Sequence, residues 1–342
     1  MEPRKLLRIQ STWNVAKVMS HLDGALSGSG PALGFGNIEI ESVPENIAVV
    51  VATSGSTGKA KAVALNSSAL ITSAKLSNDY VAAKPGEVWS LLVTPNHAAG
   101  INVLVRSLEL GTRPITDPNL KADFTAIVAT QLYRALNGDE VLLNHLLNAK
   151  AVLVGGSAIA EDLLSKGRKI GINLITTYGM TETSGGCVYN GKALPGVEIR
   201  IGKTIEIKTP TLASTYLGNE KLWQQKLNAG FFVTEDLGRL DGDLLTVIGR
   251  IDDVIISGGK NISLSEIENF LPFDAAAFSI ADPEWGDTLN LAIVGEFDES
   301  KIQDSLQSNF GVKAKRIIKV NELPKSALGK IDRGALASKV MK

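Results

Sequence analysis

Apolar runs of strand length alternate with longer helix-like segments through the first half of the chain. The runs are mostly β-branched and are bounded by turn residues, which predicts strands, and the segments between them predict helices. The predicted strands are 47–52, 88–94, 125–128, 151–154 and 173–176, and the predicted helices are 67–80, 101–110, 131–136 and 160–170. This alternation predicts an α/β sheet, in which ligands gather at the carboxyl ends of the strands.

The pattern changes near Gly196, where single apolar and polar positions begin to alternate. The stretches "VEIRIG", "KTIEIKT" and "DGDLLTVIGR" follow this alternation, which predicts hairpins. After Arg250 the pattern predicts a helix near 265–271, strands at 276–280 and 289–294, a helix at 301–308 and a strand in "KRIIKV". We therefore expect a large α/β domain with a hairpin-rich subdomain over residues 1–250, and a small α+β domain over residues 251–342.

Composition narrows the class of protein. A chain of 342 residues is too long for one compact core, which supports two domains. The 35 basic and 36 acidic residues nearly cancel, so no bulk charge favours nucleic acid or an anionic membrane. The single cysteine, Cys187, excludes an intramolecular disulfide and a cysteine-rich metal site. We find no signal-peptide core and no run of about 18 apolar residues, and we expect a cytoplasmic protein without membrane insertion.

Small and hydroxylated residues follow the first strongly apolar run, in "VATSGSTGKAKAV" from residue 51 to residue 63. A loop of this kind after a buried strand is typical of a phosphate site, although a solvated Ser/Gly turn has the same composition. The loop is not of the Walker type, because Thr53 replaces the first glycine and Ala60 replaces the hydroxyl residue that would hold Mg²⁺.

The same loop resembles the phosphate loop of the adenylate-forming superfamily, which contains acyl-CoA synthetases, luciferases and peptide-synthetase adenylation domains. The usual Pro and final Gly of that signature are Ala60 and Ala62 here. Glycines let backbone N–H groups approach phosphates, and hydroxyls and a lysine supply further donors. The residues that match the signature are Thr53, Ser54, Gly55, Ser56, Thr57, Gly58 and Lys61.

Two further stretches of the first domain resemble motifs of this superfamily. The segment "TTYGMTET" (176–183) contains its Y-G-x-T-E element, and "VLVGGSA" (152–158) resembles the turn that lines the adenine and acyl pocket. The resemblance implies that Glu182 binds Mg²⁺, for which a hard carboxylate is suited, and that Thr181 contacts the AMP phosphate. It also places near the adenine Tyr178, Gly179, Gly155, Gly156 and Ser157.

Motifs around the expected domain boundary occur in the order that the superfamily has. The segment "VTEDLGRL" (233–240) matches T-x-D-x-G, and "GRIDDVIISGGKNIS" follows it at residues 249–263. The resemblance implies that Asp236 and Arg250 bind the ribose and that Asp252 is the hinge between the domains. Gly258, Gly259 and Lys260 would face the CoA tunnel.

The segment "LPKSALGKIDRGAL" (323–336) resembles the terminal element P-x-x-x-x-G-K-x-x-R, with Lys330 as the catalytic lysine. Pro324, Gly329 and Arg333 are in register with it. The family reaction has two steps: a carboxylate attacks the α-phosphate of Mg·ATP to give acyl-AMP, and the thiol of CoA then displaces AMP. The implied cofactors are therefore ATP and Mg²⁺, with CoA as a co-substrate, and rotation about Asp252 would exchange Lys330 for the CoA-facing loop.

The short chain indicates a subgroup. Only about 52 residues precede the phosphate loop, so we expect part of the usual N-terminal subdomain to be absent. In this respect the chain resembles o-succinylbenzoate–CoA ligases of the compact actinobacterial type. In "TPNHAAGINVLVRSLELG" (94–111), His97 matches the pocket histidine, and Arg106 has the spacing associated with the second carboxylate of that substrate. A buried guanidinium needs an anionic partner, but Arg106 could instead pair with Glu109 or reach water. Ser184 and Gly185 would border the acyl pocket.

Other functions stay open beside o-succinylbenzoate–CoA ligation in menaquinone biosynthesis. One is another aryl- or acyl-CoA ligase, and a second is a catalytically silent nucleotide-binding protein on the same scaffold. A P-loop kinase is disfavoured by Thr53 and Ala60. Dimers are common in this superfamily, so a homodimer is one possible state, and the sequence does not settle the oligomeric state. We expect Cys187 to be a buried packing residue, since no histidine lies near it in the sequence.

Overall fold

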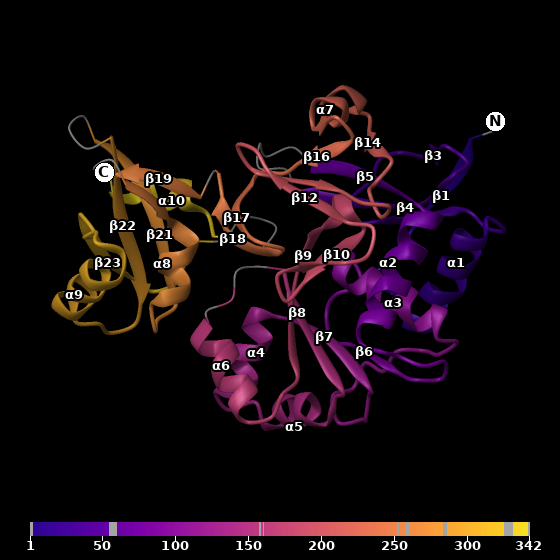
Figure 1. The fold of residues 1–342 in the computed structure, drawn as a ribbon, viewed down its shortest axis with the longest axis horizontal. Coiled ribbons are helices and arrows are strands. Elements are labelled where there is room, and N and C mark those ends of the chain that lie inside the picture. Colours follow the sequence, from indigo (N-terminus) through magenta and orange to yellow (C-terminus); the bar gives the residue numbers. More distant parts are fainter. Residues whose placement is uncertain are drawn as a thin grey trace. The chain divides into compact units, whose positions relative to one another are not determined.

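A computed structural model describes residues 3–54, 60–156, 159, 161–251, 253–257, 260–282, 286–324 and 331–340 (Figure 1). Contacts divide the chain into two compact units. The first unit comprises Met1–Gly202, Glu206–Thr234 and Leu240–Thr246, and the second comprises Lys203–Ile205, Glu235–Arg239 and Val247–Lys342. The domain boundary that the sequence places after Arg250 stays a prediction.

A six-stranded sheet in the first unit carries the strands around the predicted phosphate loop. Its order is β14 (Thr215–Leu217), β5 (Ala60–Asn66), β4 (Ile47–Ser54), β2 (Ala32–Phe35), β1 (Arg4–Arg8) and β3 (Ser42–Val43). Strands β1, β2 and β4 run parallel, whereas β4 and β5 form an antiparallel pair in which Thr53 lies opposite Lys61. The β-branched run of β4 is fully buried between its neighbours, which suits a central strand.

The second sheet is the α/β layer that the alternating pattern predicts. Its order is β17 (Asp236–Asp241), β18 (Leu244–Arg250), β11 (Lys192–Ala193), β10 (Gly185–Tyr189), β9 (Leu174–Met180), β8 (Ala151–Gly155), β7 (Phe124–Val128) and β6 (Trp89–Leu91). Strands β6 to β9 are parallel, and β10 returns antiparallel to β9. The helices α4 (Ala129–Leu136), α5 (Glu140–Asn148) and α6 (Glu161–Lys169) occur between these parallel strands along the chain. The carboxyl ends of neighbouring strands therefore meet at one edge.

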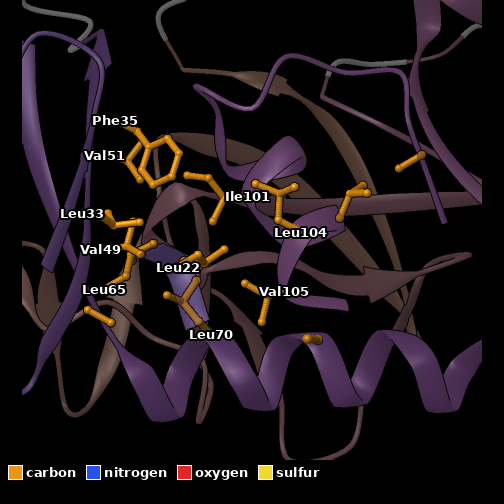
Figure 2. Packing of buried hydrophobic residues seen from close by; sticks show 14 of the residues in the cluster. Leu22, Leu33, Phe35, Val49, Val51, Leu65, Leu70, Ile101, Leu104 and Val105 are labelled. Carbon is orange, nitrogen blue, oxygen red and sulfur yellow. The ribbon is translucent and has the colours of Figure 1, made fainter. Parts of the chain in front are cut away.

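Three helices share a core with the two sheets: α1 (Val15–Ser27), α2 (Ser67–Tyr80) and α3 (Ala98–Glu109). Figure 2 shows side chains from these helices packed against strand residues, with Leu22 and Leu70 close to Val49 and Leu65. Every position of α3 from Gly100 to Ser107 is buried, so this helix is enclosed on all sides. Fully burying one large apolar side chain contributes about 1.5–3 kcal/mol, so this core fixes where α3 begins.

The hairpin-rich part of the first unit contains a four-stranded sheet. Its order is β12 (Glu198–Ile201), β13 (Ile205–Lys208), β16 (Phe231–Val233) and β15 (Leu227–Asn228), with α7 (Glu220–Gln225) preceding β15. The aromatic rings of Tyr216, Trp223 and Phe232 pack in sequence, with centroids 5.0 and 5.3 Å apart. This aromatic stack joins β14, α7 and β16.

The second unit has its own sheet and core. The sheet order is β20 (Lys260–Ser263), β19 (Val254–Ser257), β22 (Gly286–Val294) and β21 (Ala275–Asp282), and β23 (Arg316–Val320) pairs with β22. The helices are α8 (Leu264–Phe270), α9 (Glu299–Phe310) and α10 (Arg333–Val340). The predicted fold class, α/β followed by α+β, is confirmed. Within the described ranges no helix is both long and apolar enough to cross a membrane.

Candidate active site

The predicted adenylate-site residues of the first unit follow the carboxyl ends of neighbouring parallel strands. Gly155 and Gly156 end β8, and Tyr178 and Gly179 lie near the end of β9, directly before the short helix η1 (Thr181–Thr183). Ligands of α/β sheets bind at this edge. Several predicted positions lie outside the described residues: Gly55, Ser56, Thr57, Gly58, Ser157, Asp252, Gly258, Gly259 and Lys330.

Hydrogen bonds hold both the side chain and the backbone of Glu182 at this edge of the sheet. Its Oε1 accepts a hydrogen bond of 2.7 Å from the hydroxyl of Tyr216, and its backbone carbonyl accepts one of 2.7 Å from the N–H of Ala213. No described residue donates a hydrogen bond to Oε2. One oxygen is thus held by the protein, while the other is available to a ligand.

Lys61 approaches the same tyrosine from the other sheet. Its ammonium lies 5.3 Å from the centre of the Tyr216 ring, a cation–π contact. Lys61 is on β5, which pairs with β14 so that Tyr216 lies opposite Val63. The structure therefore brings Lys61, Tyr216 and Glu182 together, and two of these three were predicted from the sequence.

The turn after Glu182 is held by buried polar side chains. Thr183 Oγ1 accepts from the N–H of Met180 at 2.9 Å and donates to the carbonyl of Gly185 at 2.7 Å. Ser184 has φ of 51°, a left-handed conformation that is uncommon for a residue other than glycine. Its carbonyl accepts hydrogen bonds from Asn102 Nδ2 (2.8 Å) and Ser73 Oγ (2.9 Å). These bonds stabilise the turn that carries the predicted Thr181 and Glu182.

His97 lies at the beginning of α3 as its N-cap residue, with its side chain exposed and making no capping bond. Gly100, one turn later, has no room for a side chain, since a Cβ there would lie 2.2 Å from the Thr94 carbonyl oxygen. This close approach packs the 94–97 segment against the first turn of the helix. His97 is therefore an exposed residue at a helix N-terminus.

Arg106 lies in the enclosed part of α3. It is nine positions after His97, roughly 13 Å along the helix axis, and only 4% of it is exposed. Its guanidinium carbon lies 4.9 Å from the centre of the Trp89 ring, and Nη2 donates to the Tyr189 hydroxyl at 3.3 Å. Burial lowers the pKa of Arg106, an effect that Tyr189 partly opposes.

Neither alternative partner for Arg106 is observed. Glu109 faces Lys75 at 3.7 Å, and the near-complete burial of Arg106 excludes a guanidinium that reaches water. Among the described residues no carboxylate pairs with Arg106, and its Nε has no hydrogen-bond partner. That Arg106 binds a substrate carboxylate therefore stays a prediction.

Cys187 is buried, as predicted. It is 1% exposed, and burial raises the pKa of its thiol to about 12. A thiol so protonated at neutral pH is a packing residue and a poor nucleophile.

The second unit contains two of the predicted ribose-binding residues. Arg250 forms an ion pair of 2.5 Å with Glu235, and its Nη1 lies 3.8 Å from Asp236 Oδ1. Arg333, from the terminal motif, bonds Asp253 Oδ1 at 2.9 Å and both carboxylate oxygens of Glu268 at 2.9 and 3.0 Å. The structure thus brings Asp236 and Arg250 together, and it anchors α10 to the segment after Asp252.

The chemistry of the donors fits a magnesium ion that arrives with phosphate. Mg²⁺ is usually held by one or two carboxylates, with water and substrate phosphates completing its shell. Glu182 offers one oxygen of this kind, and the described part of the chain contains no group of three or more His, Cys, Asp or Glu that would form a cage for the ion. A single carboxylate with one oxygen that no described residue occupies is therefore compatible with a magnesium ion that arrives bound to a nucleotide.

These features define an enzyme that binds AMP and activates an acid. Residues 10–211 match the family model described as AMP-binding enzyme, and the chain belongs to this family. The probable 2-succinylbenzoate–CoA ligase of Mycobacterium tuberculosis is 34% identical over 97% of this chain and 97% of the relative. The 2-succinylbenzoate–CoA ligase of Lactococcus lactis is 32% identical over 85% of this chain and 71% of the relative.

A solved structure agrees on the fold. The o-succinylbenzoate CoA synthetase (MenE) of Bacillus subtilis, in complex with the acyl-adenylate intermediate OSB-AMP, has a TM-score of 0.77 and 22% identity. The match covers 97% of this chain and 82% of that one. The adenylate-forming superfamily that the sequence motifs predict is therefore confirmed.

Two residues of the site escaped the sequence analysis. Tyr216 lies in "STYLGN", where nothing marks it apart from an ordinary strand aromatic. Asn102 did carry a signal, because a lone amide stands between Ile101 and Val103 in a fully apolar stretch. Buried polar side chains need partners, so such an interruption indicates a specific hydrogen bond.

Proposed function

We propose that this chain is a 2-succinylbenzoate–CoA ligase, which forms the acyl-adenylate from ATP and then transfers the acyl group to CoA. The observation that carries the proposal is Glu182, held through one oxygen beside Lys61 at the carboxyl edge of the parallel sheet. The mycobacterial relative with this name matches nearly the whole length of both chains, which supports the same substrate.

In the proposed first step, a carboxylate oxygen of the acid attacks the α-phosphorus of ATP, and the bond to the β-phosphate breaks to release pyrophosphate. Bound Mg²⁺ would neutralise charge on the phosphates, and Glu182 would hold it. Thr181, Lys61 and the loop from Thr53 to Gly58 would donate to phosphate oxygens. Fixed donors of this kind act where negative charge develops.

Further residues would bind the nucleotide and the acid. Tyr178, Gly179, Gly155, Gly156 and Ser157 would surround the adenine. Asp236 and Arg250 would bind the ribose, and the ion pairs of Arg250 with Glu235 and Asp236 support this role because they fix the guanidinium. His97, Ser184 and Gly185 would border the acyl group.

In the proposed second step, the CoA sulfur attacks the acyl carbon and the bond to the AMP oxygen breaks. We propose that the domain after Asp252 rotates between the steps, so that Lys330 serves the first and the loop from Gly258 to Lys260 serves the second. Gating of this kind lets one site perform two reactions in sequence. Cytoplasmic location is part of the same proposal, because ATP and CoA are both consumed.

A second candidate is an aryl-CoA ligase for a monocarboxylic acid. A charged guanidinium in the acyl pocket would argue against a fatty acid. Arg106 contacts Trp89 and Tyr189 and pairs with no carboxylate among the described residues, so an aromatic monocarboxylic acid stays open.

Mass spectrometry of the products separates these candidates. Purified protein is incubated with Mg·ATP and CoA plus 2-succinylbenzoate, benzoate or a fatty acid. We expect AMP and a thioester from 2-succinylbenzoate only. If AMP and a thioester form only from the other acids, the protein is a CoA ligase but 2-succinylbenzoate is not its substrate. If no acid is turned over, the result favours a catalytically silent nucleotide-binding protein.

A further inference from the structure

Tyr216 contacts both charged groups of the proposed phosphate site. Its hydroxyl donates to Glu182 Oε1 at 2.7 Å, and the face of its ring receives the ammonium of Lys61 at 5.3 Å. Lys61 comes from a strand of one sheet, and Glu182 comes from the short helix η1 that follows β9 of the other sheet. One neutral side chain therefore contacts both the cation and the anion that would act on the same phosphates.

The tyrosine itself is held rigidly. Only 1% of Tyr216 is exposed, and its ring meets Trp223 edge to face, with centroids 5.0 Å apart and planes at 83°. Its backbone is paired with Val63 on β5. A buried ring with a fixed backbone has little freedom to lose, so the hydroxyl can impose its position on the carboxylate.

The strand around Tyr216 supports Glu182 a second time. The N–H of Ala213, three residues earlier, donates to the backbone carbonyl of Glu182 at 2.7 Å. Main chain and side chain of Glu182 are thus both fixed by the segment that leads into β14. A surface-exposed glutamate without these contacts would sample several rotamers.

The chemical consequence concerns the second oxygen. A neutral donor on Oε1 orients the carboxylate without cancelling its charge, and it leaves Oε2 for a hard cation. Outer-shell partners of metal ligands act in this way, and their loss typically weakens metal binding about 10- to 100-fold. A direct ion pair between Lys61 and Glu182 would neutralise the negative charge that the metal needs. With its ammonium on the ring face, Lys61 would not form that pair.

We propose that Tyr216 is a positioning residue for the Mg²⁺-binding carboxylate: it aims Glu182 at the metal–nucleotide complex and keeps Lys61 apart from it. The inference rests on the proposed function, because it takes Glu182 as the magnesium ligand.

The test measures ATP binding by titration calorimetry, without turnover, in Mg²⁺ and in EDTA. For Tyr216→Phe, which removes only the hydroxyl, we expect the Mg²⁺-dependent gain in ATP affinity to fall about 10- to 100-fold. Affinity in EDTA should stay as in the wild type. The matched control is Tyr189→Phe, because Tyr189 is also fully buried and its hydroxyl bonds Ser77 Oγ at 2.7 Å. Its Mg²⁺-dependent gain should be unchanged.

A wild-type Mg²⁺ dependence in Tyr216→Phe would overturn the inference, as would an equal loss in both variants. If Tyr216→Phe does not fold, a fluorinated tyrosine at 216, whose hydroxyl ionises at lower pH, replaces it. The Mg²⁺-dependent gain should then decrease as pH rises, since a phenolate cannot donate, and a flat profile would overturn the inference. Failure of the wild type to form AMP from any acid would instead contradict the proposed function. The two failures can be told apart, because the binding measurement requires no turnover.

Discussion

At the scale of single residues, the charged groups of the site, Glu182 and Lys61, make few contacts with the protein, and this leaves them able to bind a ligand. Glu182 is held through Oε1 and its backbone, and Lys61 lies on an aromatic ring. Both keep hydrogen-bonding capacity that a ligand could use. Charge-assisted hydrogen bonds to phosphate are stronger than neutral ones, so capacity of this kind can be converted into binding.

The proposed role of Lys330 makes a prediction about only one of the two half-reactions. Lys330→Ala should slow formation of the acyl-adenylate by roughly 10²–10³-fold, the scale of removing one contact to developing charge. Thioester formation from supplied acyl-AMP should be largely unaffected. Pyrophosphate release and thioester formation are measured separately, and an equal loss in both would contradict the role.

Arg106 offers a test of substrate choice. Because its guanidinium is buried against Trp89 and Tyr189, we expect Arg106→Ala to destabilise the fold and to raise KM for 2-succinylbenzoate and for ATP by similar factors. Arg106→Met keeps most of the side-chain volume but removes the charge. We expect it to recover most of the free energy of unfolding that Arg106→Ala loses, since a buried charge without an acidic partner contributes little to stability. A large KM effect confined to 2-succinylbenzoate would support the predicted contact with its second carboxylate.

The sequence predicted the residue types of the site better than their contacts. Motif order located Glu182, Tyr178 and Gly155 at the carboxyl edge of one sheet, because that edge follows from strand direction alone. The contacts of Arg106 with Trp89 and Tyr189 could not be predicted, because helical spacing does not say which neighbours a side chain meets once the helix is enclosed on every face. The contact of Tyr216 with Glu182 joins positions 34 apart in sequence, and no local pattern encodes it.

At the scale of elements, the strongest predictions came from periodicity and the weakest from short strands. The helix predicted at 67–80 is α2 without change, and the runs predicted at 47–52 and 151–154 are β4 and β8. The pattern did not separate β5 from the phosphate loop before it, because Ala60 to Asn66 contains too few large apolar residues. It also missed α1 and α5.

The approach of β9 to β10 depends on an absent side chain. A Cβ at Gly179 would lie 2.1 Å from the Gly185 carbonyl oxygen, so Gly179→Ala should push the two strands apart. We expect a loss of about 1–3 kcal/mol in the free energy of unfolding and a larger loss of ATP binding, because Glu182 follows β9.

Gly24→Ala is the matched control, since Gly24 lies inside α1 and its Cβ would make only ordinary contacts of 3.7 Å, with Ser29 and Gly30. It should stabilise the protein by about 0.5–1 kcal/mol. Urea unfolding and ATP titration measure both variants, and equal effects of the two substitutions would contradict the argument.

At the scale of the whole molecule, stability should depend on pH through Cys187. The thiol has a pKa of about 12 in the folded chain against 9.0 for an ordinary thiol. Between these values the unfolded state loses the proton and the folded state keeps it, so stability is full below about pH 9 and decreases as pH rises. The total decrease is about 4 kcal/mol at most.

Denaturant unfolding between pH 8 and pH 11 measures this effect. Cys187→Ala is the reference, because other groups also titrate in this range. We expect the wild type to lose more stability than Cys187→Ala as pH increases. Parallel curves for the two proteins would show that the thiol is not buried in solution.

The same thiol has a practical consequence for observing the two units move. Since the chain has one cysteine and it is buried, the native protein should take up maleimide dyes only at cysteines introduced on the surface. Lys75 in the first unit and Lys301 in the second have side chains that are 63% and 84% exposed, and a cysteine at each would carry a donor and an acceptor dye. Single-molecule energy transfer could then follow the distance between the units while ATP, acid and CoA are added in turn, without first building a cysteine-free background.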